Sequence, residues 1–272
     1  MKLLFWNTNR NKAINKHIAS IVSEFGINII ILAEYEADYK DLLRRLEFLG
    51  EHFEKNYTVG CERIVLLSSS VKIQPAVQDK YYSIHIIEDK YVLAGLHLMS
   101  DLYGNHYDKR LVKIQSAMHD IHDAERIVGS RRTIIIGDMN ESPYDRGCLS
   151  AHGFHGLPDL KAEDVKMRTV DGIEYTKYYN PTWNLLGNRH YPPGTYYKNR
   201  AELYTPMWYM IDQVIIGQDL IDTFNLEEYR IITEYSNTKL YDNNKHPDRS
   251  VSDHFPIMCE VNDNKEMATY GE

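Results

Sequence analysis

A carboxylate and an amide follow the apolar run 134–136, which is bounded by two arginines and a glycine. Such a short β-branched run is typical of a buried strand. Asp138 and Asn140 stand just past its end, and ligands gather at the carboxyl ends of strands in α/β proteins. We therefore expect both side chains to point into a cleft, where a carboxylate can orient water and an amide can hold an anion. An ordinary Asx turn would produce the same local pattern.

Other predicted strands place polar side chains at their ends in the same way. Five more apolar segments carry polar residues at or near their ends. Asn7 follows 2–6, Glu34 follows 28–33 and His97 follows 91–96, while Asp212 lies near the start of 210–216, and Asp253 and His254 precede 255–261. Carboxylate and imidazole groups bind metal ions and transfer protons. Their repeated placement at strand ends is a stronger indication of one site than any single motif.

The predicted helices alternate with these strands. Segments 11–25 and 38–49 carry apolar residues at helical spacing, and 106–128 is a longer helix candidate. Segments 63–69 and 82–87 are predicted as further strands. This alternation favours a layered α/β domain.

In chain order, the polar motifs are Trp-Asn at 6–7, Ala-Glu at 33–34, His97, Gly-Asp-Met-Asn at 137–140, Ile-Asp at 211–212 and Ser-Asp-His at 252–254. This ordered set resembles the endonuclease/exonuclease/phosphatase superfamily, the deoxyribonuclease I-like enzymes, over residues 1–262. The resemblance implies an α/β (α+β) fold, a four-layer sandwich of two packed mixed β-sheets flanked by helices. It also implies a single catalytic domain with divalent-metal phosphoesterase activity. Residues 263–272 are polar, and we expect a disordered tail.

The resemblance implies that Glu34 is the Mg²⁺ ligand, with Asn7 adjacent and Asp253 close, and that Mn²⁺ can substitute. Mg²⁺ suits a site with one or two carboxylates because it keeps several of its waters. Glu36, two residues on, is expected to fall outside this geometry.

By the same resemblance, Asp138 would orient or deprotonate the attacking water, and Asn140 would hold a phosphate oxygen. His254 would bind the scissile phosphate as imidazolium or relay a proton. Asp212 would fix the tautomer of His254 and raise its pKa.

His97 resembles the histidine of the deoxyribonuclease I, sphingomyelinase and inositol-phosphatase branches, where it acts as a general acid or phosphate contact. Glu62 is a candidate for its acidic partner. Arg110, at the start of the following predicted helix, is a candidate contact for the substrate phosphate, although a surface arginine fits equally well.

Residues 174–209 form an aromatic-rich stretch with eight tyrosines, two tryptophans and four cations. Long irregular stretches in compact domains are usually functional or disordered, and this aromatic content argues against disorder. We expect a substrate-facing insertion, with Trp183, Tyr196 and Arg200 as binding residues, because aromatic faces beside cations suit stacked bases and phosphates. The alternative is that these tyrosines pack against the core.

The composition excludes some classes. A net charge of −8 argues against broad, sequence-independent binding to a polyanion. Three widely separated cysteines make a disulfide framework improbable. No signal peptide or membrane-length apolar run is evident, so we expect a cytoplasmic location.

Three function classes follow from these features. The favoured one is a Mg²⁺-dependent nuclease or nucleotide phosphodiesterase, with a nucleic acid or nucleotide as partner and no membrane. The second is a phosphatase or sphingomyelinase-like esterase acting on a small phosphorylated molecule or a lipid headgroup. A non-catalytic binding relative is the weakest, because no expected site residue is missing.

Overall fold

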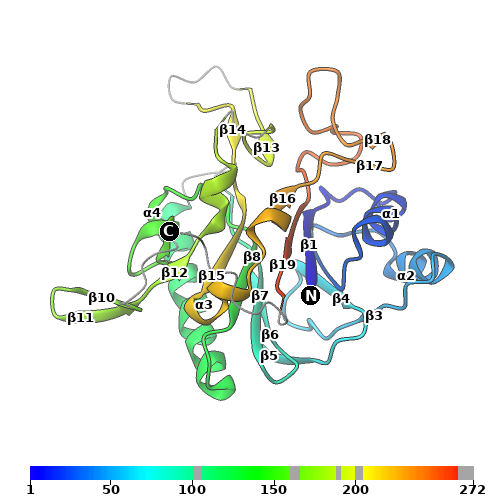
Figure 1. Cartoon of the computed structure of the whole chain (residues 1–272). Helices are drawn as coiled ribbons and strands as arrows, with labels where there is room; N and C mark the ends of the chain where they lie inside the picture. The colour runs from blue at the N-terminus through cyan, green and yellow to red at the C-terminus, as the bar shows by residue number, and fades with distance from the viewer. Residues whose placement is uncertain (101–105, 160–165, 188–190, 200–204, 263–272) are drawn as a thin grey trace, which may run out of the picture.

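Two β-sheets packed face to face form the centre of the molecule, with helices on both outer faces (Figure 1). The computed structural model describes residues 1–100, 106–159, 166–187, 191–199 and 205–262. The predicted fold, a sandwich of two mixed sheets flanked by helices, is confirmed. The predicted tail at 263–272 lies outside the described residues.

The first sheet contains the N-terminal strand. Its spatial order is β16 (Arg230–Ile231), β19 (Ile257–Glu260), β1 (Lys2–Asn7), β2 (Ile29–Ala33), β4 (Ile64–Ser68) and β3 (Glu54–Lys55). Only β1 and β2 run parallel among these neighbours. Their carboxyl ends therefore lie at one edge, which brings Asn7 close to Glu34.

The second sheet supplies the opposite half of the core. Its order is β5 (Ile73–Asp79), β6 (Tyr82–Ile87), β7 (Tyr91–His97), β8 (Thr133–Asp138), β15 (Asp212–Gly217), β12 (Tyr178–Tyr179) and β9 (Gly156–Leu157). Parallel β7 places His97 opposite Asp138, and antiparallel β15 places its first residue, Asp212, opposite Asp138 as well. The register thus gathers three of the predicted site residues at one edge.

The apolar run of β8 is buried on both sides. Ile134 and Ile136 enter the core between the two sheets, whereas Ile135 packs under the helix that covers the second sheet. Burial on both faces explains why this strand is continuously apolar and does not alternate with polar residues.

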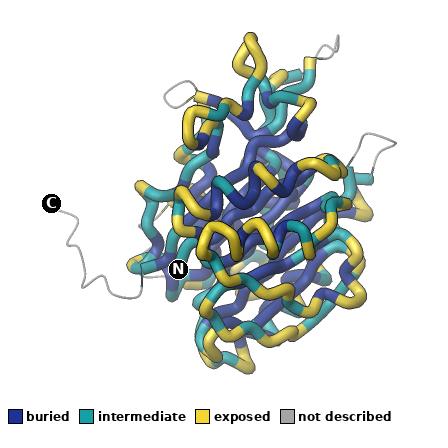
Figure 2. The backbone as a smooth tube through the Cα atoms, turned by 90° about the vertical axis from the view of Figure 1, so that its right-hand side faces the viewer, coloured by how far each residue is buried: buried dark blue, intermediate teal, exposed yellow. Residues whose placement is uncertain are grey.

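Three long helices cover the sheets. The first sheet is covered by α1 (Asn15–Phe25) and α2 (Tyr39–Phe48), and the second by α3 (Tyr107–Val128); the short α4 (Arg146–Leu149) follows β8. Figure 2 shows buried and exposed backbone alternating along the helices in front of the buried strands. Each long helix lies within the segment predicted for it. In the described part of the chain, no helix is long and apolar enough to cross a membrane.

The described residues of 174–209 are divided among three places, rather than forming one insertion. The hairpin of β10 (Met167–Val170) and β11 (Ile173–Thr176) lies at one end, while β12 is a buried strand of the second sheet, followed by the 3-10 helix η2 (Pro181–Leu185). The ribbon of β13 (Tyr196–Tyr197) and β14 (Trp208–Tyr209) lies at the other end (Figure 1). Part of the aromatic content, including Tyr178 and Tyr179, therefore belongs to the core.

The remaining chain between β15 and β19 is mostly short elements. These are the 3-10 helices η3 (Gln218–Thr223) and η4 (Leu226–Glu228) and the hairpin of β17 (Glu234–Tyr235) and β18 (Thr238–Lys239). The β17–β18 hairpin and the β13–β14 ribbon stand on opposite sides of the edge at which β1 ends (Figure 1).

Arg110 joins α3 to the turn after β8. Its Nε donates to Oε1 of Glu141 at 3.0 Å, and its Nη1 donates to the Met99 carbonyl at 2.9 Å. The two charged side chains are only 4% and 1% exposed. The guanidinium is therefore directed into the protein and paired there, which does not fit a surface arginine and leaves the predicted contact with the substrate phosphate without support.

Replacing Arg110 with Met should destabilise the fold by about 3–5 kcal/mol, because Glu141 would keep a buried, unpaired charge. The double variant Arg110→Met/Glu141→Met should recover much of this loss in a thermal or urea unfolding experiment. Lys109→Met, exposed on the same helix, is the matched control and should change stability little. Unchanged stability of Arg110→Met together with weaker substrate binding would return Arg110 to the substrate contacts.

Candidate active site

A buried hydrogen bond between the two sheets joins the ends of β1 and β8. Nδ2 of Asn7 donates to Oδ2 of Asp138 at 3.0 Å. The hydroxyl of Ser252 donates to the Asn7 carbonyl at 2.7 Å, which ties the Ser-Asp-His segment to the same point. Three of the predicted motifs therefore meet at one place in the fold.

The turn after β8 is an Asx turn, and it also shapes the site. The backbone N–H of Asn140 donates to Oδ1 of Asp138 at 2.9 Å, and its Nδ2 donates to the Leu98 carbonyl at 3.0 Å. Asn140 has a φ of 50°, a conformation that Asn tolerates better than most residues. The two interpretations of this motif are thus compatible, because the turn holds Oδ1 of Asp138 while Asn7 holds Oδ2.

His254 and Asp212 form a buried pair. Nδ1 of His254 lies 2.8 Å from Oδ2 of Asp212, and neither side chain is more than 7% exposed. Burial alone would lower the pKa of His254, but the charge and hydrogen bond of Asp212, with smaller contributions from Asp138 and Asp253, raise it to about 10. The pair therefore holds an imidazolium whose Nδ1 is committed to Asp212.

In Asp138, by contrast with His254, the surroundings disfavour the charged form of the side chain. Its complete burial and the nearby charge of Asp212 raise its pKa to about 7, against the opposing effects of His254, Asn7 and the Asn140 backbone. A carboxyl with a pKa near neutrality can accept a proton from water more readily than an ordinary aspartate.

His97 lies between two carboxylates but stays neutral. Its Nε2 is 3.5 Å from Oε1 of Glu34 and 3.8 Å from Oδ2 of Asp138. Burial, then the charges of Arg63, His254 and Arg10, lower its pKa to about 3. The neighbouring acids are thus Glu34 and Asp138 instead of the suggested Glu62, which is exposed.

Glu34 is held by a residue that sequence reasoning missed. Nε of Arg10 lies 3.2 Å from Oε2 of Glu34 and 3.8 Å from Oε1 of Glu36. Glu36 is about half exposed, and among the described residues no contact joins it to the buried cluster. The only signal for Arg10 in the sequence is a cation three residues after Asn7, which is too common to interpret.

The oxygen atoms at this edge fit a hard divalent cation. Ligand atoms of Asp138, Asp212 and His254 lie within 4.8 Å of one another. Because His254 is an imidazolium paired with Asp212, only the two carboxylates could bind a cation there, and Oδ1 of Asp212 is buried without a hydrogen-bond partner in the described structure. Glu34 contributes a further carboxylate next to His97. Carboxylate oxygens with few other protein ligands are what Mg²⁺ prefers.

The other two predicted metal ligands, Asn7 and Asp253, differ in how available their side chains are to a cation. The Asn7 amide is bonded on both sides, since its Nδ2 donates to Asp138 and its Oδ1 accepts from the Asn9 backbone at 3.1 Å. Asp253 is partly exposed and close enough to His254 for its charge to raise the pKa of that ring.

The predicted substrate-binding residues have different environments. The Tyr196 ring lies 4.9 Å from the His254 ring, and the two residues form an isolated β-bridge. The Trp183 ring lies 6.4 Å from that of Tyr144, a residue of the segment that follows β8. The structure thus places Tyr196 directly against the buried cluster. Arg200 lies outside the described residues.

The β13–β14 ribbon is held above this edge by aromatic packing. Tyr197 stacks on His246 with ring centroids 3.5 Å apart and an interplanar angle of 7°. Trp208 contacts both of these rings, at 5.1 Å and 5.7 Å. These contacts attach the ribbon to His246, in the segment after β18. On the same ribbon, Tyr196 contacts His254 of the cluster.

No family model matches the sequence, and no curated protein matches it. Solved structures do match. The 3′ phosphatase NExo from Neisseria, bound to a product DNA hairpin, has a TM-score of 0.57 at 13% identity, covering 96% of this chain and 99% of that one. An AP endonuclease from Archaeoglobus fulgidus has a TM-score of 0.56 at 10% identity, with 96% and 99% coverage.

TDP2 from D. rerio, complexed with a single-strand DNA product, has a TM-score of 0.57 at 16% identity, covering 95% of this chain and 97% of that one. At such low identities the likeness concerns the fold. The resemblance drawn from the polar motifs is confirmed at that level: the chain has the deoxyribonuclease I-like fold of the endonuclease/exonuclease/phosphatase superfamily.

Proposed function

We propose that this protein is a divalent-metal-dependent phosphodiester hydrolase that acts on a nucleic acid or a nucleotide. The observation that best supports the proposal is the buried cluster of Asp138, Asp212 and His254, in which a carboxylate with both oxygens hydrogen-bonded lies beside a carboxylate–imidazolium pair. Its members come from distant parts of the chain and meet at the edge that also carries Glu34 and His97.

Asp138 would orient and deprotonate the attacking water. One of its oxygens accepts from Asn7 and the other from the Asn140 backbone, so the carboxylate cannot rotate freely. Fixing the base in advance reduces the entropy lost in reaching the transition state. The second N–H of the Asn140 amide would donate to a phosphate oxygen.

His254 would bind the scissile phosphate as imidazolium. Since Nδ1 is committed to Asp212, the positive charge and the Nε2 proton remain for a phosphoryl oxygen. His97, which stays neutral, would donate a hydrogen bond to the phosphate or to the leaving oxygen.

Glu34, with Asn7 and Asp253 nearby, would hold Mg²⁺, for which Mn²⁺ can substitute. When bound, the cation would neutralise negative charge on the phosphoryl oxygens and lower the pKa of bound water.

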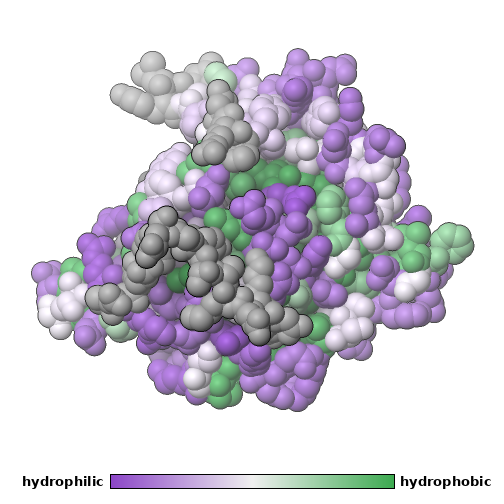
Figure 3. Space-filling view, viewed as in Figure 1, coloured by the Kyte–Doolittle hydropathy of each residue, from purple (hydrophilic) through white to green (hydrophobic). Residues whose placement is uncertain are grey.

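The proposed substrate class rests on Tyr196 and on the similar structures. An aromatic ring beside the imidazolium suits a base next to a phosphate. Two of the similar structures are described as holding DNA products. The visible part of the face shown in Figure 3 is mainly hydrophilic, which is less suited to docking on a membrane that carries a lipid substrate. A phosphatase or sphingomyelinase-like esterase would use the same cluster and is the alternative.

Glu34→Gln should weaken Mn²⁺ binding, measured by calorimetry, and should severely reduce Mg²⁺-dependent cleavage of DNA and RNA oligonucleotides. Removing the charge takes away the proposed metal-binding carboxylate. Glu36→Gln is the matched control, since Glu36 also contacts Arg10 but is half exposed, and it should change little. Equal defects in the two variants would show that the wrong carboxylate is assigned.

Tyr196→Ala should weaken binding of a single-stranded oligonucleotide by about 1–3 kcal/mol, because a stacking surface is lost. Hydrolysis of bis-p-nitrophenyl phosphate should change much less, since that ester has no base. Tyr196→Phe keeps the ring and should bind normally, and Tyr175→Ala, on the distant β11, serves as the control. A parallel loss on both substrates would contradict a base-stacking role and favour the small phosphoester alternative.

A further inference from the structure

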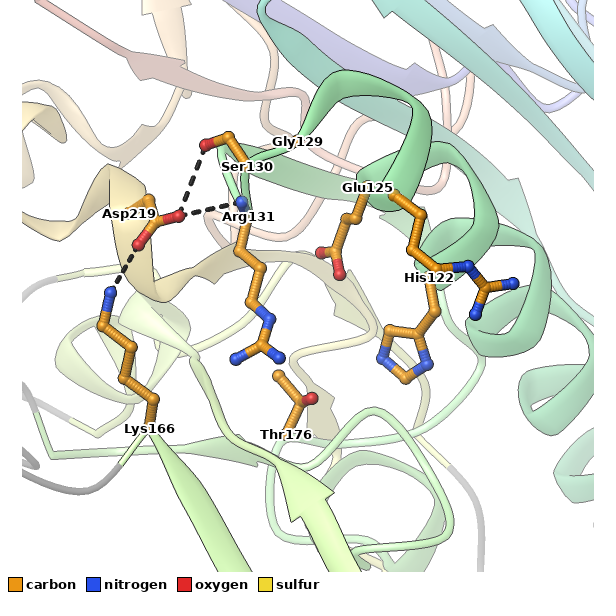
Figure 4. A pocket seen from close by; sticks show the side chains of 9 residues that line it. His122, Glu125, Gly129, Ser130, Arg131, Lys166, Thr176 and Asp219 are labelled. Carbon is orange, nitrogen blue, oxygen red and sulfur yellow. Dashed lines mark hydrogen bonds and ion pairs between the residues drawn. The ribbon is translucent and has the colours of Figure 1, made fainter.

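A cavity lies at the end of the second sheet opposite to the candidate active site. It has a volume of about 580 Å³ and is located where α3 ends and β8 begins (Figure 4). Small-molecule sites usually have volumes of roughly 300–1,000 Å³. Because β8 has six residues, the cavity is about 20 Å from Asp138, at a rise of ~3.3 Å per residue. It is therefore separate from the proposed catalytic cluster.

Three cationic side chains from different segments line this cavity. Arg126 comes from α3, Arg131 from the turn before β8, and Lys166 from the residue before β10. Two of these cations already have carboxylate partners, since Lys166 pairs with Asp219 and Arg126 pairs with Asp123. Arg131 is therefore the cation that is left to attract an anion.

The carboxylates of the cavity are already satisfied by the protein. Asp219 accepts from Lys166 Nζ at 2.6 Å, from the Arg131 backbone at 2.9 Å and from the Ser130 hydroxyl at 3.3 Å. Glu125 is buried and accepts from the hydroxyls of Thr133 and Tyr178. Burial raises the pKa of Glu125, which lowers its tendency to carry a charge.

Two polar side chains in the cavity, those of Arg131 and His122, are not paired with a charged group of the described residues. The guanidinium of Arg131 contacts the Met167 sulfur at 3.7 Å and makes no ion pair with any described residue. Nε2 of His122 is buried and has no hydrogen-bond partner in the part of the chain that the structure describes. Figure 4 shows the Arg131 side chain extending into the cavity, with Lys166 on one side and His122 on the other.

We propose that this cavity binds a small phosphate-bearing anion through Arg131, with Lys166, Arg126 and His122 around it. A guanidinium presents a planar fork of N–H donors that matches the oxygens of a phosphate, and such charge-assisted bonds are among the strongest in proteins. The site does not depend on the proposed hydrolysis, because none of its residues belongs to the catalytic edge.

The test is calorimetric titration of the full chain with inorganic phosphate in the presence of EDTA, so that divalent cations do not hold phosphate at the catalytic edge. Arg131→Met should weaken phosphate binding about tenfold or more, because a charge-assisted contact is lost. The Lys166 side chain is 57% exposed, so the Lys166→Met variant should fold normally. It should also bind phosphate more weakly. Titration with glycerol 2-phosphate distinguishes a phosphate ester from the free ion as the preferred ligand.

Two controls make the result specific. Arg168→Met removes the same charge from the neighbouring exposed position on β10 and should leave binding unchanged. His254→Ala removes the proposed phosphate contact at the catalytic edge and should leave the Arg131-dependent part of the binding unchanged. In wild type, phosphate should shift the NMR signals of the His122 ring.

Unchanged phosphate binding in Arg131→Met would overturn the proposal, as would the absence of binding in wild type. A lower melting temperature of Arg131→Met without any change in phosphate binding would show that these cations only stabilise the carboxyl end of α3.

Discussion

Two buried carboxylates, Asp138 and Asp212, face each other across neighbouring strands, and the arrangement of this end of the molecule depends on compensating them. Uncompensated buried charge is strongly destabilising. The compensation comes from Asn7, the last residue of β1 in the other sheet, which donates to Asp138, and from His254, three residues before β19, which pairs with Asp212. The same contacts that make the cluster chemically useful therefore also fix the two sheets relative to each other.

The backbone around the cluster is adapted to this arrangement at particular positions. A side chain at Gly137 would collide with the Leu96 carbonyl, so glycine allows β8 to lie against β7 and places Asp138 beside His97. Glu34 has a φ of 48°, uncommon for a residue other than glycine. Its carbonyl accepts from the Thr8 hydroxyl at 2.8 Å, so the turn that presents its carboxylate is held by the residue that follows β1. Unusual backbone conformations of this kind are concentrated at functional sites.

The sequence predicted the elements whose patterns reflect burial, such as the β8 run and the three long helices. It did not predict β5, because Pro75 and a bulge interrupt the alternation on this edge strand. The polar strand ends were recognisable because they recur along the chain, whereas Arg10 and Arg110 were not interpretable. A single arginine in a sequence does not show whether it faces solvent, a carboxylate or the interior. The sequence likewise does not distinguish a core tyrosine from one at the site: within 174–209, Tyr178 packs in the core and Tyr196 contacts the cluster.

The most direct test of this account is the protonation state of His254, measured by NMR of the ring nitrogens as a function of pH. Because the pKa is raised to about 10, both ring nitrogens should remain protonated at pH 8. His97, with a pKa lowered to about 3, should be neutral throughout and provides an internal reference. Asp212→Asn keeps the shape of the side chain but removes its charge, and it should lower the pKa of His254 markedly. A neutral His254 at pH 7 in the wild-type protein, or an unchanged pKa in Asp212→Asn, would contradict the account.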